Sequence, residues 1–312
     1  MPRFFDAGRR RRRPLQNDRI CDSVFKFVAN GDTTILNSQF SILNSQFLNA
    51  MNTQISHNNI PLLVAENISV PHGFTSRIGG VSKSPYDSLN LGLNRGDAAE
   101  NVAENRRLLA QALGYDEGKL VLTRQTHSDI VRVVTARDAR GIDHRDYPEA
   151  DGLVTNEPGV ALWVFTADCT PILLYDPLTG AVGAVHAGWR GTASKIAAKA
   201  VRKMTEAFGS QPENIRAAIG PAIGQCCFET NADVPEAMLS AYGAGANAHI
   251  LQRGEKYYVN LEALNTLALQ EVGVRDITQS HICTKCQCHR FWSHRATAGI
   301  RGSQGAIIVC SL

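Results

Sequence analysis

The sequence has no apolar run that approaches the roughly 18 residues needed to cross a membrane. Its N-terminus also lacks the apolar stretch and the small-residue cleavage site of a secretory signal. We therefore expect a cytoplasmic protein with no membrane partner. In that compartment its eight cysteines are expected to be reduced, which leaves some of them available for metal binding or catalysis.

An excess of positive charge is also missing once the first 50 residues are set aside. The chain of 312 residues carries 32 Lys and Arg and 29 Asp and Glu, of which eight and four lie in residues 1–50. Residues 51–312 therefore hold 24 basic and 25 acidic side chains, a formal charge of −1. This balance argues against nucleic acid as a partner. We interpret the basic run Arg9–Arg13 as a solvated tail.

Residues 1–50 differ in character from the rest of the chain. After the arginine run come two copies of a seven-residue repeat, Ile35–Ser41 and Ile42–Leu48, which are too few for a solenoid. Our hypothesis is that Met51 is the true or main start. We expect residues 1–57 to be a disordered or non-native extension and residues 58–312 to form the catalytic domain.

Helical and strand patterns are mixed beyond residue 58, without a regular alternation of the two. Helical spacing of apolar residues predicts helices at 101–113, 192–208, 232–241 and 261–272. Short apolar runs predict strands at 120–122, 130–135, 160–165, 171–175, 181–186, 215–219 and 306–310. The segment Pro71–Asp97, rich in Gly, Ser, Asn and Pro, predicts a structured loop. Together these patterns favour a single α+β or layered α/β domain.

Three side chains that bind metals follow or end apolar stretches, namely His127, Cys169 and His186. Two imidazoles and one thiolate suit zinc, and three protein ligands leave a fourth position for water or substrate. Zinc lowers the pKa of a water bound to it to about 7. The intervals of 42 and 17 residues match no short metal motif, so structural roles for the two histidines and a core role for the thiol remain alternatives.

Two further features lie beside these residues. Gly188 and Gly191 flank Arg190 just before a predicted helix, which predicts an anion site made of backbone N–H groups and a guanidinium. The alternative is that the glycines only permit a tight turn. Asp168, next to Cys169, is a candidate for proton transfer, with a structural carboxylate bonded to backbone N–H groups as the alternative.

Seven motifs then occur in an order that resembles the YfiH/YlmD family, once labelled laccase-domain or multicopper polyphenol oxidase. The resemblance covers about residues 60–312. The motifs are His72-Gly-Phe-Thr-Ser-Arg77-Ile-Gly-Gly80, Tyr86-Asp-Ser88-Leu-Asn90-Leu-Gly92, Gln125-Thr-His127, Ala150-Asp151-Gly152, Thr166-Ala-Asp168-Cys169, His186-Ala-Gly-Trp-Arg190-Gly191 and Ile219-Gly-Pro-Ala-Ile223.

The resemblance implies an α+β fold with α/β/β/α layers and a zinc site made of His127, Cys169 and His186, at which catalysis takes place. It implies phosphorolysis of adenosine, inosine, guanosine and methylthioadenosine, with adenosine deamination as a further activity. Purine nucleosides and phosphate are then the expected partners. We interpret five residues in or beside the motifs as binding substrate or phosphate: Arg77, Asn90, Gln125, Asp168 and Arg190.

The C-terminal part departs from the family pattern. Many relatives carry Phe-Phe-Ser-Tyr/His-Arg-Arg, whereas this chain has Phe291-Trp292-Ser293-His294-Arg295-Ala296. The second arginine of the family is therefore absent here, which puts a pocket role for that cation in doubt. Arg301 is the nearest candidate to replace it.

Three other functions remain open. A true multicopper oxidase is poorly supported, because the chain has nine histidines and no His-x-His pair. Cys169 with His186 or His127 would suit a cysteine hydrolase or deamidase, and such chemistry would include the peptidoglycan-precursor editing linked to some relatives. A non-enzymatic, zinc-stabilised binding module is the third. The sequence leaves the preferred nucleoside and the oligomeric state open.

The remaining cysteines have a less specific pattern. The segment Cys283-Thr-Lys-Cys286-Gln-Cys288-His289 contains four potential ligands but crowds them into one short turn, which favours reduced thiols over a second metal. The adjacent pair Cys226 and Cys227 is predicted to pack as small apolar side chains near the Gly220-Pro221 turn.

Overall fold

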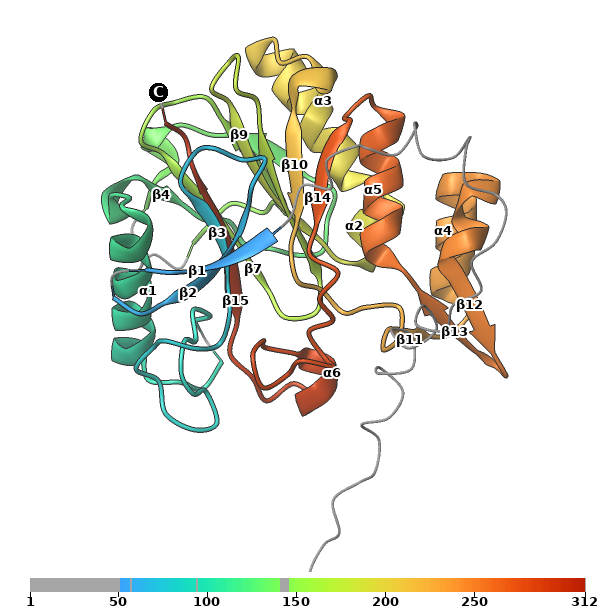
Figure 1. Cartoon of the computed structure of the whole chain (residues 1–312), viewed down its shortest axis with the longest axis horizontal. Helices are drawn as coiled ribbons and strands as arrows, with labels where there is room; N and C mark the ends of the chain where they lie inside the picture. Colours follow the sequence, from blue (N-terminus) through green and yellow to red (C-terminus); the bar gives the residue numbers. More distant parts are fainter. Residues whose placement is uncertain (1–50, 57, 94, 141–145, 312) are drawn as a thin grey trace, which may run out of the picture. The chain divides into compact units, whose positions relative to one another are not determined.

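Two six-stranded sheets form the centre of the protein in a computed structural model that describes residues 51–56, 58–93, 95–140 and 146–311 (Figure 1). The first sheet has the order β1 (Met51–Ile55), β2 (Pro61–Ala65), β3 (His72–Thr75), β15 (Gln304–Val309), β7 (Ala161–Thr166) and β4 (Leu120–Val121). The second has the order β14 (Asp276–Gln279), β10 (Arg216–Ile219), β8 (Thr170–Tyr175), β9 (Val182–Ala187), β6 (Gly152–Thr155) and β5 (Val131–Val133).

The two sheets pack face to face, and the strands at their centre are buried on both sides. In β7, Leu162 and Val164 join the apolar layer between the sheets, whereas Ala161 and Trp163 face the opposite way. This alternation follows from the two-residue period of a strand. Because both faces of such strands are covered, their sequences are almost continuously apolar.

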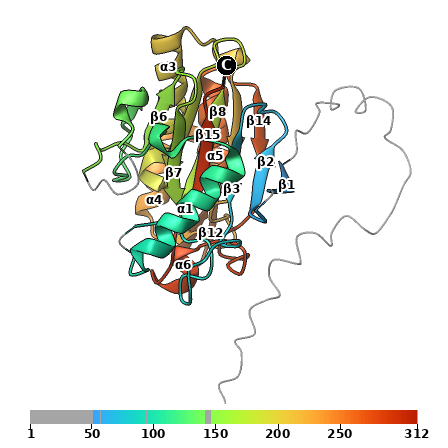
Figure 2. The same ribbon diagram turned by 90° about the vertical axis from the view of Figure 1, so that its left-hand side faces the viewer.

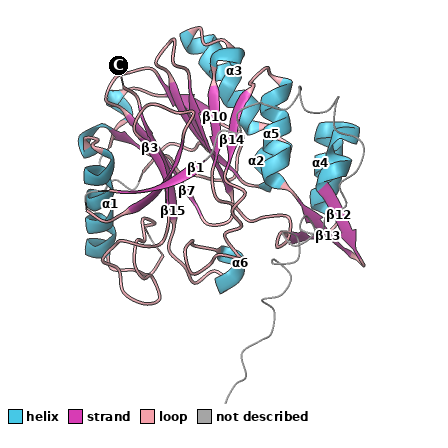
Figure 3. Cartoon of the chain, in the orientation of Figure 1, coloured by secondary structure: helices cyan, strands magenta, loops and turns pink. Residues whose placement is uncertain are grey.

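Helices cover the two outer faces (Figures 1 and 2). Helix α1 (Ala99–Leu113) lies on the first sheet through Leu109 and Ala110. Helices α3 (Ile196–Phe208) and α5 (Leu261–Glu271) lie on the second, with Val201, Met204 and Leu269 in its outer core. The predicted α/β/β/α layering is therefore confirmed, as Figure 3 shows by element type.

A smaller subassembly lies against α5. Helix α4 (Asp233–Tyr242) packs beside a three-stranded sheet of order β11 (Glu229–Thr230), β13 (Lys256–Val259) and β12 (Ile250–Arg253). Helices α2 (Trp189–Ala193) and α6 (His294–Thr297) are one-turn elements near the ends of the strands. Short 3₁₀ helices occur at Glu117–Lys119, Ala136–Asp138, Pro212–Asn214 and Gly243–His249.

The predicted helices and strands are present, but strands β2, β6, β11, β12, β13 and β14 were not predicted. Three of the predictions also differ from the structure. The helix predicted at 192–208 was wrong at its start, because Lys195 adopts a left-handed conformation with φ of 54° and separates α2 from α3. The loop predicted at Pro71–Asp97 begins with strand β3. Residues 51–55, which the sequence placed in the extension, form β1 and pair along their whole length with β2.

The predictions for residues 1–50, which include the basic tail, the repeat and the start at Met51, lie outside the described residues. Among the residues that are described, no helix has both the length and the apolar character required to span a bilayer.

Candidate metal centre and cavity

Strand pairing in the second sheet brings the three predicted metal ligands to one edge. Strands β5 and β6 run parallel, and β6 pairs antiparallel with β9, as does β8. The starts of β5, β6 and β8 therefore meet the end of β9 at a single edge. Pro171 lies opposite His186 in this ladder, so Cys169 at the start of β8 comes beside the end of β9. His127 precedes β5 at the same edge.

The potential ligand atoms of His127, Cys169 and His186 all lie within 4.8 Å of one another. Nε2 of His127 is 3.7 Å from Sγ of Cys169, and the two imidazole rings are edge-on with centroids 5.0 Å apart. Tetrahedral zinc with bonds of about 2.05 Å to nitrogen and about 2.3 Å to sulfur would separate those atoms by about 3.6 Å. The donor set and its spacing therefore fit zinc.

Burial decreases across this set toward the solvent. His186 is buried, Cys169 is half-buried and His127 is exposed. The protein thus closes one side of the three potential ligands and leaves the other side open, where a bound zinc would have a free fourth position for water or substrate.

The carboxylate of Asp151, which belongs to the motif Ala150-Asp151-Gly152, connects two of the three potential ligands, His186 and His127. It is completely buried at the start of β6. Its Oδ1 accepts hydrogen bonds from Nδ1 of His186 at 2.7 Å and from the backbone N–H of His127 at 3.1 Å. Its Oδ2 accepts from the backbone N–H groups of Thr126 and Ser128 and from the Ser128 hydroxyl.

These bonds give Asp151 two effects on the ligands. Because Nδ1 of His186 donates to the carboxylate, Nε2 of that ring is left to face Cys169 and His127 as the ligand atom. The bonds to residues 126–128 fix the turn that carries His127. A buried acid directly before an apolar strand is a signal that could have identified Asp151 in the sequence, because such a group requires several hydrogen-bond donors.

Without a metal, the three neighbouring groups Cys169, His186 and Asp151 shift one another's pKa values. Burial raises the pKa of Cys169, but the charge of His186 and hydrogen bonds from both imidazoles outweigh burial and lower it to about 6. Burial lowers the pKa of His186, yet the Cys169 thiolate and the bond to Asp151 raise it to about 9. Despite burial, the bonds from His186 and Ser128 lower the pKa of Asp151 to about 2. The thiol is therefore already in its metal-binding, ionised form at neutral pH.

Backbone conformations uncommon for non-glycine residues occur at two positions of this edge. His127 has φ of 60° and Asp168, next to Cys169, has φ of 90°. Outliers of this kind persist where the surrounding structure enforces them, and they gather at functional sites. Gly188 is needed for a different reason, since a Cβ atom there would lie 2.7 Å from Cδ2 of His127 and 3.3 Å from Sγ of Cys169.

The open side of the ligands faces a cavity of about 690 Å³. It lies where the edge of the second sheet meets the segments after β4 and β7 and before β15 in the first. This volume is typical of a site for a small molecule. Its described lining includes the three potential metal ligands, the aromatic residues Tyr147, Phe165, Trp189 and Phe228, the carboxylate of Asp168, and five arginines at 95, 106, 124, 295 and 301.

Of the five residues interpreted as binding substrate, Gln125 and Asp168 line the cavity. Both are engaged with the protein. The side-chain amide of Gln125 donates to the carbonyl of Phe165 and accepts from its N–H. Asp168 accepts from the Thr284 hydroxyl at 2.6 Å and from the backbone N–H of Arg295 at 2.7 Å, which agrees with the structural alternative for this carboxylate.

The structure does not bring Arg77, Asn90 and Arg190 to the cavity lining. Arg77 donates to the carbonyls of Asp87 and Cys288 and lies over the ring of Trp292. Asn90 is completely buried and supports the loop that leads to the cavity. The side chain of Arg190 is exposed and stacks on Trp189 instead.

Arg301, the candidate replacement for the missing family arginine, does lie in the cavity wall. Its guanidinium donates to the carbonyl of Gly302 and to the Ser303 hydroxyl. Its Nε is buried and has no hydrogen-bond partner among the described residues. Burial and the nearby charge of Arg95 lower the pKa of Arg301 to about 10, so the two cations lie close together without full compensation.

Comparisons with known proteins agree on one family. A sequence profile described as multi-copper polyphenol oxidoreductase laccase matches residues 71–311. A protein of Deinococcus radiodurans named purine nucleoside phosphorylase is 41% identical over 250 residues, which is 80% of this chain and 92% of that protein. A protein of an unknown prokaryotic organism named adenosine deaminase RL5 is 36% identical over 239 residues, 74% of this chain and 90% of that protein.

Among solved structures, the hypothetical protein YfiH of Bacillus licheniformis superimposes with a TM-score of 0.78 at 35% identity, and the match covers 83% of this chain and 99% of that one. The profile, the sequence relatives and the shared fold together confirm the resemblance seen in the motifs. The chain therefore belongs to the family described as multi-copper polyphenol oxidoreductase laccase, which includes the YfiH and YlmD proteins.

Proposed function

We propose that this chain is a zinc-dependent purine nucleoside phosphorylase that acts on adenosine, inosine, guanosine and methylthioadenosine. The observation that carries the proposal is the composition of the cavity. The cavity is lined by the ligand set His127, Cys169 and His186 and also by the half-buried Arg301, which lies near Arg95 and whose Nε is buried without a hydrogen-bond partner among the described residues. The names of relatives support the same reaction class.

In phosphorolysis a phosphate oxygen attacks C1′ of the sugar while the bond from C1′ to the purine nitrogen breaks. The purine leaves with a negative charge that must be neutralised, and the ribose passes through a cation-like state. Zinc bound by the three ligands would act as a Lewis acid that offsets negative charge in the site. Asp151 would hold His127 and His186 in place during the reaction, because preorganised ligands need no rearrangement.

The arginines supply the phosphate subsite in this proposal. Phosphate is best held by guanidinium groups, which present paired N–H donors. Arg301 is only partly bonded and its pKa is lowered to about 10 by burial and by Arg95, so an anion would gain a hydrogen bond and relieve the repulsion between the two cations. The rings of Phe165, Trp189 and Phe228 offer apolar faces to the planar base.

Adenosine deamination and copper-dependent oxidation are the two alternative reactions. Deamination of adenosine consumes water instead of phosphate, and one relative is named for it. The buried Nε of Arg301, which has no hydrogen-bond partner among the described residues, favours an anionic co-substrate and hence phosphorolysis. For copper oxidase chemistry, the described residues offer two groups of three or more ligands, one of them composed of cysteines alone. That inventory does not favour the histidine-rich centres of a laccase.

The direct test is to incubate zinc-loaded protein with inosine or adenosine, with and without inorganic phosphate, and to separate the products by chromatography. We expect hypoxanthine and ribose-1-phosphate from inosine only when phosphate is present, and adenine from adenosine under the same condition. Purine release that does not depend on phosphate would contradict the proposal, as would conversion of adenosine mainly to inosine.

The variant Arg301→Gln tests the phosphate subsite. A charge-assisted hydrogen bond is worth about 1.5–3 kcal/mol, so we expect the KM for phosphate to rise roughly 10- to 100-fold, with a much smaller change in the KM for inosine. The control is Arg190→Gln, which removes an exposed arginine that does not line the cavity and should leave both constants nearly unchanged. Equal effects of the two variants would place the anion elsewhere.

A further inference from the structure

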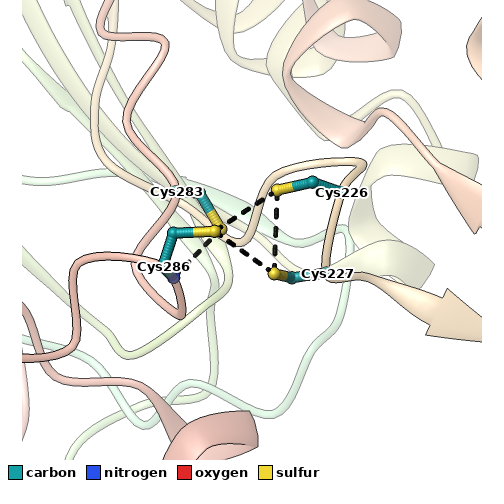
Figure 4. Close-up of side chains that lie close together, drawn as sticks. All are labelled: Cys226, Cys227, Cys283 and Cys286. Atoms are coloured by element: carbon teal, nitrogen blue, oxygen red, sulfur yellow. Dashed lines mark hydrogen bonds between the residues drawn. The ribbon is translucent and has the colours of Figure 1, made fainter. Parts of the chain in front are cut away.

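Four cysteines outside the cavity converge from two distant segments (Figure 4). Cys226 and Cys227 lie in the turn between β10 and β11, and Cys283 and Cys286 follow β14. Sγ of Cys227 is 3.6 Å from Sγ of Cys226 and 3.4 Å from Sγ of Cys286, and Cys226 and Cys286 are 3.6 Å apart. All four sulfurs lie within 4.8 Å of one another.

These distances are those of thiolates around one ion. Zinc–sulfur bonds of about 2.3 Å at tetrahedral angles place the sulfurs about 3.8 Å apart. A disulfide requires about 2.05 Å, and none of the four cysteines is bonded to another described residue in this way. Four sulfurs that approach one another mutually, rather than in two separate pairs, are the arrangement that a tetrahedral tetrathiolate site needs.

The backbone holds the two segments in register. Ala222 and Cys283 form a parallel bridge, in which the N–H of Ala222 donates to Ile282 and the N–H of Thr284 donates back to Ala222. The N–H of Cys286 points at Sγ of Cys283 at 3.5 Å. The thiols are therefore brought together by the same backbone pairing that extends the second sheet.

Gly224 has no side chain, and this allows the two cysteine segments to approach each other. A Cβ atom on Gly224 would lie 3.1 Å from Cβ of Cys283 and 3.4 Å from Sγ of Cys226. The turn that carries Cys226 and Cys227 is closed by N–H bonds from Cys227 and Phe228 to the Gly224 carbonyl. A glycine here lets the turn approach the opposite segment closely enough for four sulfurs to meet.

We propose that Cys226, Cys227, Cys283 and Cys286 bind a second zinc ion, which is structural and separate from the ion in the cavity. Four thiolates select zinc or iron among the common metals, and a complete set of four protein ligands leaves no position for substrate. The spacing Cys283-x-x-Cys286 is typical of zinc sites. Cys288 and His289 follow this pair closely in the sequence but are not part of the cluster.

Such a site would brace one wall of the cavity. Thr284, between two of the ligands, is completely buried and donates to Asp168, the neighbour of Cys169. Arg295 bonds to the carbonyl of Cys227 through its side chain and to Asp168 through its N–H. Zinc that ties the two segments together would therefore fix the contacts on which the position of Asp168 depends.

Metal analysis of the full-length chain, purified under reducing conditions with zinc, tests this inference. We expect two zinc ions per wild-type chain, one in Cys286→Ser and one in His127→Ala. The matched control Cys288→Ser removes a nearby thiol outside the cluster and should retain two. Replacement of zinc by cobalt in His127→Ala, which keeps all four cluster thiols, should give the strong visible and charge-transfer absorption of a tetrahedral tetrathiolate ion.

The cobalt measurement leaves the four thiols intact, so it remains decisive even if Cys286→Ser fails to fold. One zinc ion in wild type and none in His127→Ala would overturn the inference. It would also be overturned by iron as the bound metal, or by a disulfide between cluster cysteines in reduced protein seen by mass spectrometry. None of these outcomes bears on phosphorolysis, which is assayed separately.

Discussion

Cys169→Ala should reduce phosphate-dependent cleavage of inosine by at least about 1,000-fold, because a metal acting on charge in the reaction contributes several kcal/mol and each 1.36 kcal/mol is tenfold in rate. Cys169 is the only anionic member of the ligand set, and its pKa of about 6 keeps it ionised at neutral pH. Its loss should remove the cavity zinc along with the activity. Initial rates and zinc content, measured on the same preparations, check this.

The fold should survive that change, since the side chain is half-buried and small and such substitutions usually cost about 0.5–3 kcal/mol. Cys288→Ala is the matched control, because this cysteine belongs to neither group of metal ligands. It should keep zinc and activity near wild type. Full activity in Cys169→Ala, with the zinc retained, would remove the basis of the proposed site.

Removal of zinc from the wild-type protein distinguishes zinc catalysis from catalysis by a cysteine nucleophile. Without metal, Cys169 and His186 form a thiolate and imidazolium pair, which is the form that a cysteine hydrolase uses. If zinc-free protein stays active and alkylation of Cys169 abolishes that activity, the hydrolase or deamidase function is correct. We expect the opposite, namely loss of activity on zinc removal and recovery when zinc is returned.

That His127, Cys169 and His186 come together could be predicted because their signal is local. Each lies next to an apolar run that forms a strand, and a strand end offers a rigid support with an open backbone. What the sequence could not supply was the register. The pairing of Pro171 with His186 and of Gly152 with Val185 decides that these residues meet at one edge, and such pairings depend on contacts between distant parts of the chain.

Membership in a motif did not reveal which way a side chain points. Arg77 and Arg190 belong to motifs as clearly as His127 does, yet one stacks on Trp292 and the other on Trp189. Their motifs contribute to packing and turns as well as to the cavity. Arg301 shows the converse, because the absence of a second arginine at Ala296 suggested it, and the structure places it in the wall.

The convergence of four cysteines could not be predicted for the same physical reason. In the sequence, Cys283 and Cys286 group with their neighbours Cys288 and His289, because proximity along the chain is the only guide that a sequence offers. The parallel bridge between Ala222 and Cys283 supplies the other two thiols from a segment more than fifty residues earlier. Two cysteines at the spacing of a zinc motif can thus be joined by two more from a distant segment, and only the tertiary structure shows this.

Asp151→Asn should weaken zinc binding in the cavity by about 10- to 100-fold, the range found when a residue that orients a metal ligand is removed. An amide has one acceptor oxygen where the carboxylate has two. The carboxylate of Asp151 receives bonds from His186, from the Ser128 hydroxyl and from three backbone N–H groups. The NH₂ group of asparagine must therefore face at least one donor. Competition with a chromophoric chelator measures the affinity.

Asp151 is a positioning residue, because it orients His186 and His127 without binding the metal itself. A high zinc concentration should therefore restore the activity that Asp151→Asn loses. At low zinc the variant should be nearly inactive, and at high zinc its rate should recover a large part of the wild-type value, with little change in the KM for inosine. In metal-free protein the folded-state pKa of about 2 lies below the ordinary 3.8. The stability that Asp151 contributes is therefore complete above about pH 4 and is lost as pH falls through 2.

Asp176→Asn is the control that separates positioning of the ligands from support of the fold. Asp176 is also completely buried and accepts bonds from the N–H of Leu178 and the hydroxyl of Thr179, but it lies at the turn between β8 and β9, far along both strands from the metal ligands. Both variants should lower the melting temperature of the metal-free protein, because each leaves a buried site with imperfect bonds. Only Asp151→Asn should change the Kd for zinc. If both variants bind zinc as wild type does, the carboxylate of Asp151 supports the strand edge alone; if both bind it weakly, the loss reflects general destabilisation and not the orientation of His127 and His186.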